Sequence, residues 1–206
     1  MGKEELLQKL KEKVAADLTI PLRESNLVFG EGDANAAVVF VGEAPGFHED
    51  RLGRPFVGRA GQLLDELIRG VGWKREEVYI TNIIKRRPPE NRDPLPEEIE
   101  AYAPHLALEI DIINPRLVVP LGRFAMNYFL PDTKITRDHG KLFRLGNRLV
   151  LPFFHPAAAL RSTQVLNALR EDFKKLPASA ADETAPEAIE VGEAAEAPPR
   201  PQNKLF

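Results

Sequence analysis

Side chains that could do chemistry stand just after the hydrophobic runs of this sequence. An acid-rich loop with a histidine follows the first run at 42–50, the amide Asn82 stands at the end of the second, and His155 follows the last. A basic run at 85–92 comes after Asn82. Carboxylates and imidazoles exchange protons at catalytic sites, amides read hydrogen-bonding edges, and basic side chains bind phosphate.

Each of these signals has an ordinary structural explanation when it stands alone. An acidic Gly-Pro-Gly loop is usually a solvated turn, and a histidine before proline at a strand end is usually a core residue. A Lys-Arg-Arg run is usually solvent-exposed, and a single phenylalanine such as Phe56 is usually buried in the hydrophobic core. They indicate a functional site only if all of them meet at one edge of one sheet.

Alternating strands and helices would bring these residues together. Runs rich in β-branched residues predict buried strands at 37–42, 78–84, 116–122 and 148–154. Amphipathic spacing predicts helices at 3–16, 61–71, 95–113 and 164–175, with a short one ending at 130. This alternation favours a three-layer α/β/α sandwich with a central four-stranded parallel sheet. Ligands bind such sheets beyond the carboxyl ends of the strands, which is where the acid-rich loop, Asn82 and His155 are predicted to lie.

The composition excludes several classes of protein. The 206 residues contain no cysteine, so disulfides, zinc ribbons and thiolate-bound clusters are excluded, and we expect no metal or other cofactor. No apolar run approaches the ~18 residues of a membrane span, so we expect a cytoplasmic monomer without a membrane partner. Residues 177–206 hold six acidic and two basic residues among alanines and prolines. They are predicted to be a disordered tail after a folded domain at 1–176.

Several motifs together resemble the family 4 uracil-DNA glycosylases, in the family's order and spacing over about 28–175. They are Gly42-Glu-Ala-Pro-Gly46 with Glu49-Asp50, Gly53-Arg-Pro-Phe-Val-Gly58, Thr81-Asn82, Arg87-Pro-Pro89 with Asn91-Arg92, and His155-Pro156. The resemblance implies the α/β/α sandwich and the hydrolysis of the N-glycosidic bond of uracil in DNA. Two alternatives remain open: a glycosylase for a broader set of deaminated bases, or a non-catalytic reader of damaged DNA.

Roles follow from the resemblance, position by position. Glu43 would activate or position the attacking water, Asn82 would read the uracil edge, and His155 would donate to uracil O2 as negative charge develops. The uracil pocket would also be lined by Ala44, Glu49 and Phe56, with the Phe56 ring stacked on the flipped base. The residues expected to hold the DNA strand are Lys85, Arg87, Asn91, Arg92, Leu160 and Arg161.

The sequence departs from the family at the positions that hold its four-iron four-sulfur cluster. The four cysteines are replaced by Asp17, Ile20, Arg86 and Tyr102, so no cluster can be held. We predict an ion pair between Asp17 and Arg86 beside an apolar contact between Ile20 and Tyr102. A second departure is Phe47-His48, a bulky pair in the acid loop where small or acidic residues are usual.

A short peptide pattern lies at 202–206. Gln202, Leu205 and Phe206 resemble the Gln-x-x-Leu-Phe peptides by which bacterial repair proteins bind the sliding clamp. The glutamine would hydrogen-bond at the lip of a groove while the two hydrophobic side chains fill an apolar pocket. The sequence thus predicts a second partner besides uracil-containing DNA.

Overall fold

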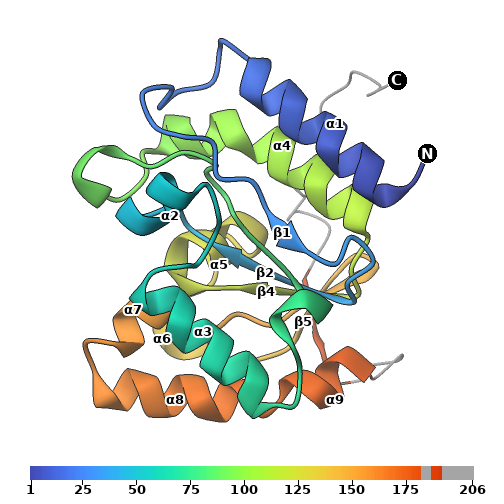
Figure 1. Cartoon of the computed structure of the whole chain (residues 1–206). Helices are drawn as coiled ribbons and strands as arrows, with labels where there is room; N and C mark the ends of the chain where they lie inside the picture. Colours follow the sequence, from blue (N-terminus) through green and yellow to red (C-terminus); the bar gives the residue numbers. More distant parts are fainter. Residues whose placement is uncertain (182–186, 192–206) are drawn as a thin grey trace.

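The computed structural model describes residues 1–181 and 187–191 of the chain (Figure 1). The strands are β1 (Glu31–Gly32), β2 (Val38–Gly42), β3 (Tyr79–Asn82), β4 (Leu117–Pro120), β5 (Phe143–Leu145), β6 (Arg148–Val150) and β7 (Ile189–Glu190). The α-helices are α1 (Lys3–Ala16), α2 (Phe47–Leu52), α3 (Arg59–Gly70), α4 (Pro96–Ile113), α5 (Gly122–Phe129), α6 (Ile135–Asp138), α7 (Pro156–Ala159), α8 (Thr163–Phe173) and α9 (Leu176–Ala181). Two short 3-10 turns lie at Arg75–Glu77 and Pro89–Asn91. No helix in this described part is long and apolar enough to cross a membrane.

The strands form one mixed sheet in the order β1-β3-β2-β4-β6-β5-β7. Its centre, β3-β2-β4-β6, is parallel throughout, which confirms the predicted four-stranded core. The prediction missed the edges: β1 pairs antiparallel with β3, β5 pairs antiparallel with β6, and β7 is parallel to β5. These three strands are two or three residues long, too short for a period-two pattern to stand out.

Helices cover both faces of the sheet, as the α/β/α prediction requires. In Figure 1, α1 and α4 lie together above the sheet, and α3 and α8 lie below it. Side chains of β2 alternate between the two layers: Val38 and Phe40 pack with α3 and α8, and Val39 and Val41 pack with α1 and α4. Gly42, two residues beyond Phe40, therefore opens on the α3 face.

Regular secondary structure extends past the predicted boundary at 176. Leu176 is fully buried at the start of α9, and β7 adds a strand to the sheet. The amide of Ile189 donates to the carbonyl of Leu142 at 2.8 Å, and that of Val191 donates to Arg144 at 3.0 Å. The predicted tail therefore contributes a helix and a strand. Residues 182–186 and 192–206, with Gln202, Leu205 and Phe206, lie outside the described residues.

Candidate active site

A small pocket opens at the carboxyl ends of β2 and β3, and it has a volume of about 170 Å³. The eight residues that line it are Ala44, Gly46, Glu49, Phe56, Ala60, Asn82, His155 and Ala157. Five of these were predicted to form one site. They come from four separate stretches of chain, and the sheet brings them together because Gly42 and Asn82 are paired at the ends of adjacent parallel strands.

Asn82 is buried against the pocket, and its Oδ1 has no hydrogen-bond partner among the described residues. Gly42 makes room for it: a Cβ on Gly42 would lie 2.3 Å from Asn82 Oδ1 and 2.5 Å from the ring of Phe56. Leaving a buried amide oxygen unpaired costs about 1–3 kcal/mol. An N–H donor that enters the pocket would remove this cost.

His155 stands at the start of α7 and faces Phe56, with ring centroids 5.7 Å apart. Its Nδ1 accepts the amide hydrogen of Ala157 at 3.1 Å, which leaves the proton of the neutral ring on Nε2. Burial lowers the pKa of His155 to about 4, although the charge of Glu49 opposes the shift. The imidazole is therefore a neutral hydrogen-bond donor at pH 7. Gly122 leaves space for it, since a Cβ there would lie 2.9 Å from that of His155.

The loop that carries Phe56 is held in a strained conformation. Phe56 has φ +51°, in the left-handed region that a bulky residue rarely adopts. Glu49 Oε1 accepts the amides of Val57 and Gly58 at 2.9 and 2.7 Å, and Arg75 donates to the Phe56 carbonyl at 3.1 Å. Arg75 also donates to the carbonyl of Pro55 at 2.6 Å, so the backbone is held on both sides of Phe56 and its ring is kept in the pocket wall. Glu49 thus supports this loop as well as lining the pocket.

Glu43 does not line this pocket, which corrects the prediction that it surrounds it together with Asn82 and His155. Its neighbour Ala44 lines the wall instead. Burial raises the pKa of the part-buried Glu43 to about 7; Asp93 adds to the rise and Arg123 opposes it. A carboxyl with this pKa exchanges protons near neutral pH.

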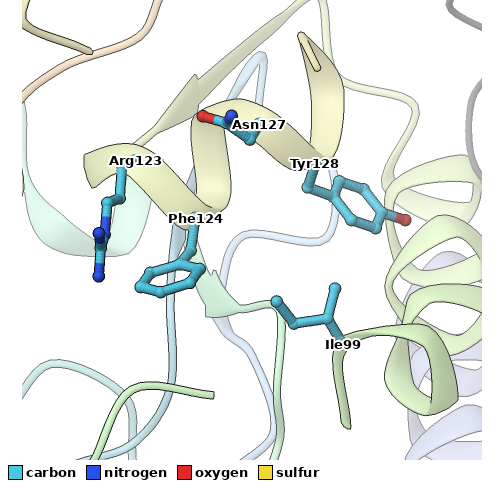
Figure 2. A pocket seen from close by; sticks show the side chains of 5 residues that line it. All are labelled: Ile99, Arg123, Phe124, Asn127 and Tyr128. Carbon is cyan, nitrogen blue, oxygen red and sulfur yellow. The ribbon is translucent and has the colours of Figure 1, made fainter. Parts of the chain in front are cut away.

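A second hollow of about 380 Å³ lies between α4 and α5, lined by Ile99, Arg123, Phe124, Asn127 and Tyr128 (Figure 2). Arg123 stands at the end of the hollow farthest from Tyr128, its guanidinium 4.4 Å from the Phe124 ring centroid, and pairs with Asp93. None of the residues predicted to bind uracil or DNA lines this larger hollow. The residues predicted to bind uracil line the smaller pocket instead.

Lys85 is not at the DNA surface, contrary to the prediction. Its side chain is fully buried, with Nζ donating to Thr81 Oγ1 and to the carbonyl of Asn82, both at 2.7 Å, and pairing with Glu109. Glu109 also accepts from Tyr79 Oη at 2.9 Å. Burial lowers the pKa of Lys85, and the Glu109 carboxylate opposes that shift. Lys85 therefore supports the end of β3 from the sheet face opposite the Asn82 side chain.

The other predicted DNA contacts lie at or near the surface. Arg87 is half-buried, and its Nε donates to exposed Asn91 at 2.7 Å. Arg92 forms a two-bond ion pair with Glu98, at 2.9 and 2.6 Å. Leu160 and Arg161 are exposed directly after α7. These side chains are accessible to a strand, but Arg92 is already neutralised by Glu98.

Two of the four positions at which the resemblance implies a cluster ligand, Asp17 and Ile20, lie in a segment that we call the strap, residues 17–28 between α1 and β1. The predicted ion pair of Asp17 with Arg86 does not form: Asp17 accepts from Thr19 at 2.8 and 2.6 Å, and Arg86 donates to a carbonyl of the strap. Asp17 does not pair with Arg86 because the amide and hydroxyl of Thr19, two residues away, already donate to its carboxylate. Four side chains that include a guanidinium and a hydrocarbon do not fit an iron–sulfur cluster.

Ile20 and Tyr102 are both buried in one hydrophobic cluster, and their direct contact stays a prediction. The Tyr102 hydroxyl also donates to the carbonyl of Pro21 at 2.9 Å, and burial raises its pKa. Tyr102 therefore fastens the strap to α4 at a position where the resemblance implies a cluster ligand.

Sequence reasoning missed the small residues that shape the pocket. Gly46, Ala60 and Ala157 line it, and Gly42 and Gly122 make room for its polar side chains. Their only signal was their place at the strand ends and beside the motifs. Asp93 and Arg123, which act on Glu43, carried no signal at all, because their proximity depends on the folding of the chain.

Comparisons with known proteins agree with this geometry. Residues 29–177 match the family model of the uracil DNA glycosylase superfamily. A type-4 uracil-DNA glycosylase of Thermotoga maritima is 45% identical over 84% of this chain and 94% of its own length. One from Sulfurisphaera tokodaii is 43% identical over 82% of the chain and 83% of its own length, and one from Archaeoglobus fulgidus is 45% identical over 74% and 81%. The chain belongs to the uracil DNA glycosylase superfamily.

Proposed function

We propose that this protein hydrolyses the N-glycosidic bond of uracil in DNA and leaves an abasic site, as a step of base excision repair. The names of its relatives support this function. The observation that carries it is the unpaired Oδ1 of Asn82 in a pocket of about 170 Å³. Uracil offers N3–H to that oxygen and O4 to the amide hydrogens. Cytosine presents the opposite pattern at both atoms.

The pocket supplies groups for the bond-breaking step. When the bond between uracil N1 and the sugar carbon breaks, its electron pair stays with the base and negative charge develops at O2. The neutral His155 ring donates from Nε2 to that oxygen, and Phe56 stacks on the base. Glu43, as a carboxylate, orients a water toward the cationic sugar and takes the proton that the water loses. Arg87, Asn91, Leu160 and Arg161 contact the strand around the site.

The test is excision from oligonucleotides that carry uracil, cytosine, hypoxanthine or xanthine, read as abasic sites. We expect excision of uracil and rejection of cytosine. Asn82→Asp removes the amide hydrogens and should lower the preference for uracil over cytosine by about 10- to 100-fold. Excision of hypoxanthine or xanthine at the uracil rate would favour the broader glycosylase. Binding of uracil-DNA without any excision would favour the non-catalytic reader.

We propose further that residues 202–206 bind a sliding clamp, which rests on the Gln-x-x-Leu-Phe pattern alone. A titration of the full chain against the clamp of the same organism tests it. Leu205→Ala/Phe206→Ala should abolish binding and leave excision from free oligonucleotides unchanged. Equal binding by both proteins would refute the proposal. The monomeric state and the cytoplasmic location stay predictions.

A further inference from the structure

Phe47 is an exposed aromatic side chain next in sequence to residues that line the pocket. It is the first residue of α2, its neighbour Gly46 lines the pocket, and Glu49 does so two residues later. The residue is 52% exposed, and no residue of α2 is buried. Phe47 therefore does not serve the core, although an aromatic ring in water gives up the stabilisation that burial would bring.

A cation is held against this ring. The guanidinium of Arg87 lies 5.2 Å from the Phe47 ring centroid, and its Nε is fixed by Asn91 Oδ1 at 2.7 Å. The backbone of Arg87 is fixed as well, since its carbonyl accepts the Ser25 hydroxyl at 2.7 Å. On another side, the His48 ring meets the Phe47 ring edge-on at 5.5 Å. Contacts from two directions thus orient an exposed ring.

The charge of Arg87 is not neutralised. Within residues 1–181 and 187–191, Arg87 forms no ion pair with a carboxylate, whereas nearby Arg92 is paired with Glu98. An oriented aromatic ring beside an unneutralised cation, next to a base-sized pocket, matches a nucleic acid strand: the ring suits a base and the cation suits a phosphate.

We propose that Phe47 and Arg87 form a stacking subsite for the nucleobase next to the uracil on the same strand, with the guanidinium facing the backbone phosphate. This inference rests on the proposed function. A nucleotide that leaves the stack for the pocket deprives its neighbour of a stacking partner. The ring of Phe47 replaces that partner, and Arg87 on the ring strengthens the attraction for the strand. Stacking of this kind tolerates any sequence, because every base has a π-face.

The test measures binding and stacking separately. The probe is a single-stranded oligonucleotide with a 2′-fluoro-arabino uridine, which resists cleavage, and 2-aminopurine beside it. Phe47→Ala should weaken binding by about 5- to 100-fold and restore the 2-aminopurine fluorescence that stacking quenches. Phe47→Tyr and Phe47→Trp should bind and quench like the unchanged protein. Leu52→Ala, at an equally exposed apolar residue of the same helix, is the matched control and should change neither signal.

Excision kinetics separate this proposal from the proposed function. On a cleavable uracil oligonucleotide, Phe47→Ala should raise KM by the same factor as the loss of binding and leave kcat nearly unchanged. Normal excision with unchanged KM and quenching in Phe47→Ala would overturn the subsite and leave the glycosylase intact. Wild-type quenching by Phe47→Leu would also overturn it, since leucine has no π-face. Absence of excision by the unchanged protein would instead overturn the proposed function.

Discussion

Thr81 and Asn82 are neighbours on β3, yet they lie on opposite faces of the sheet and in opposite chemical surroundings. Thr81 contacts Lys85 and Glu109 in a closed, fully buried network. Asn82, equally buried, keeps an unpaired oxygen at the pocket. The network around Thr81 has satisfied its polar groups within the protein, whereas Asn82 has left one for a ligand.

The difference separates stability from function along a single strand. Each charge of the buried Lys85–Glu109 pair is compensated by the other, so removing one partner leaves a buried ion without compensation. On the open face, the polar groups have few protein partners, so their removal disturbs the chemistry more than the fold. Mutations on the two faces should therefore have different readouts, which gives four ways to test the comparison.

The largest effect is expected from Lys85 and Glu109. Lys85→Met and Glu109→Leu should each lower the free energy of unfolding by about 3–5 kcal/mol, because each leaves the other charge buried without a partner. The double variant should recover most of the loss. Urea unfolding at fixed pH measures all three. A double variant as unstable as the sum of the single ones would mean that the two charges are not coupled.

His155 tests the open face. His155→Ala should lower the single-turnover excision rate by about 10²–10³, since it removes a donor to the developing oxyanion. The free energy of unfolding should fall by only about 1 kcal/mol, for the lost contact with the Ala157 amide. His155→Gln keeps an N–H donor, so its excision rate should lie between those of the unchanged protein and of His155→Ala. An unchanged rate in His155→Ala would refute the role given to this ring.

Tyr102, on the same face as Thr81, should behave as a stability residue. Tyr102→Phe removes the hydrogen bond to Pro21 and should destabilise the protein by about 1 kcal/mol, with excision unchanged. Thermal unfolding and the excision assay measure the two quantities. A marked fall in the excision rate of folded Tyr102→Phe would instead show that the closed face carries a functional group.

The smallest effect concerns the pH dependence. Excision should rise with pH through about 7, because Glu43 acts as a carboxylate and its pKa is raised to that value. Asp93→Asn removes a negative charge that raises the pKa, so the midpoint should move to lower pH by a few tenths of a unit, as expected of a solvent-screened charge. Profiles of kcat/KM against pH decide the sign. A move to higher pH would contradict the assignment.

The sequence predicted what is local and missed what depends on partners far along the chain. The central strands and α4 were predicted because their apolar spacing is set within each segment. Lys85 was misplaced because it opens a run of three basic residues, and no local pattern marks Glu109 as its partner. Glu43 was assigned to the pocket by its motif, but the next residue, Ala44, lines the wall instead, and the motif alone does not say which of the two does so.

The attachment of the strap has a consequence for how the domain is made. The hydroxyl of Tyr102 and the guanidinium of Arg86 attach the strap by donating to the carbonyls of Pro21 and Ser25. Both donors are side chains of the protein itself. Closing this junction therefore uses no iron or sulfide.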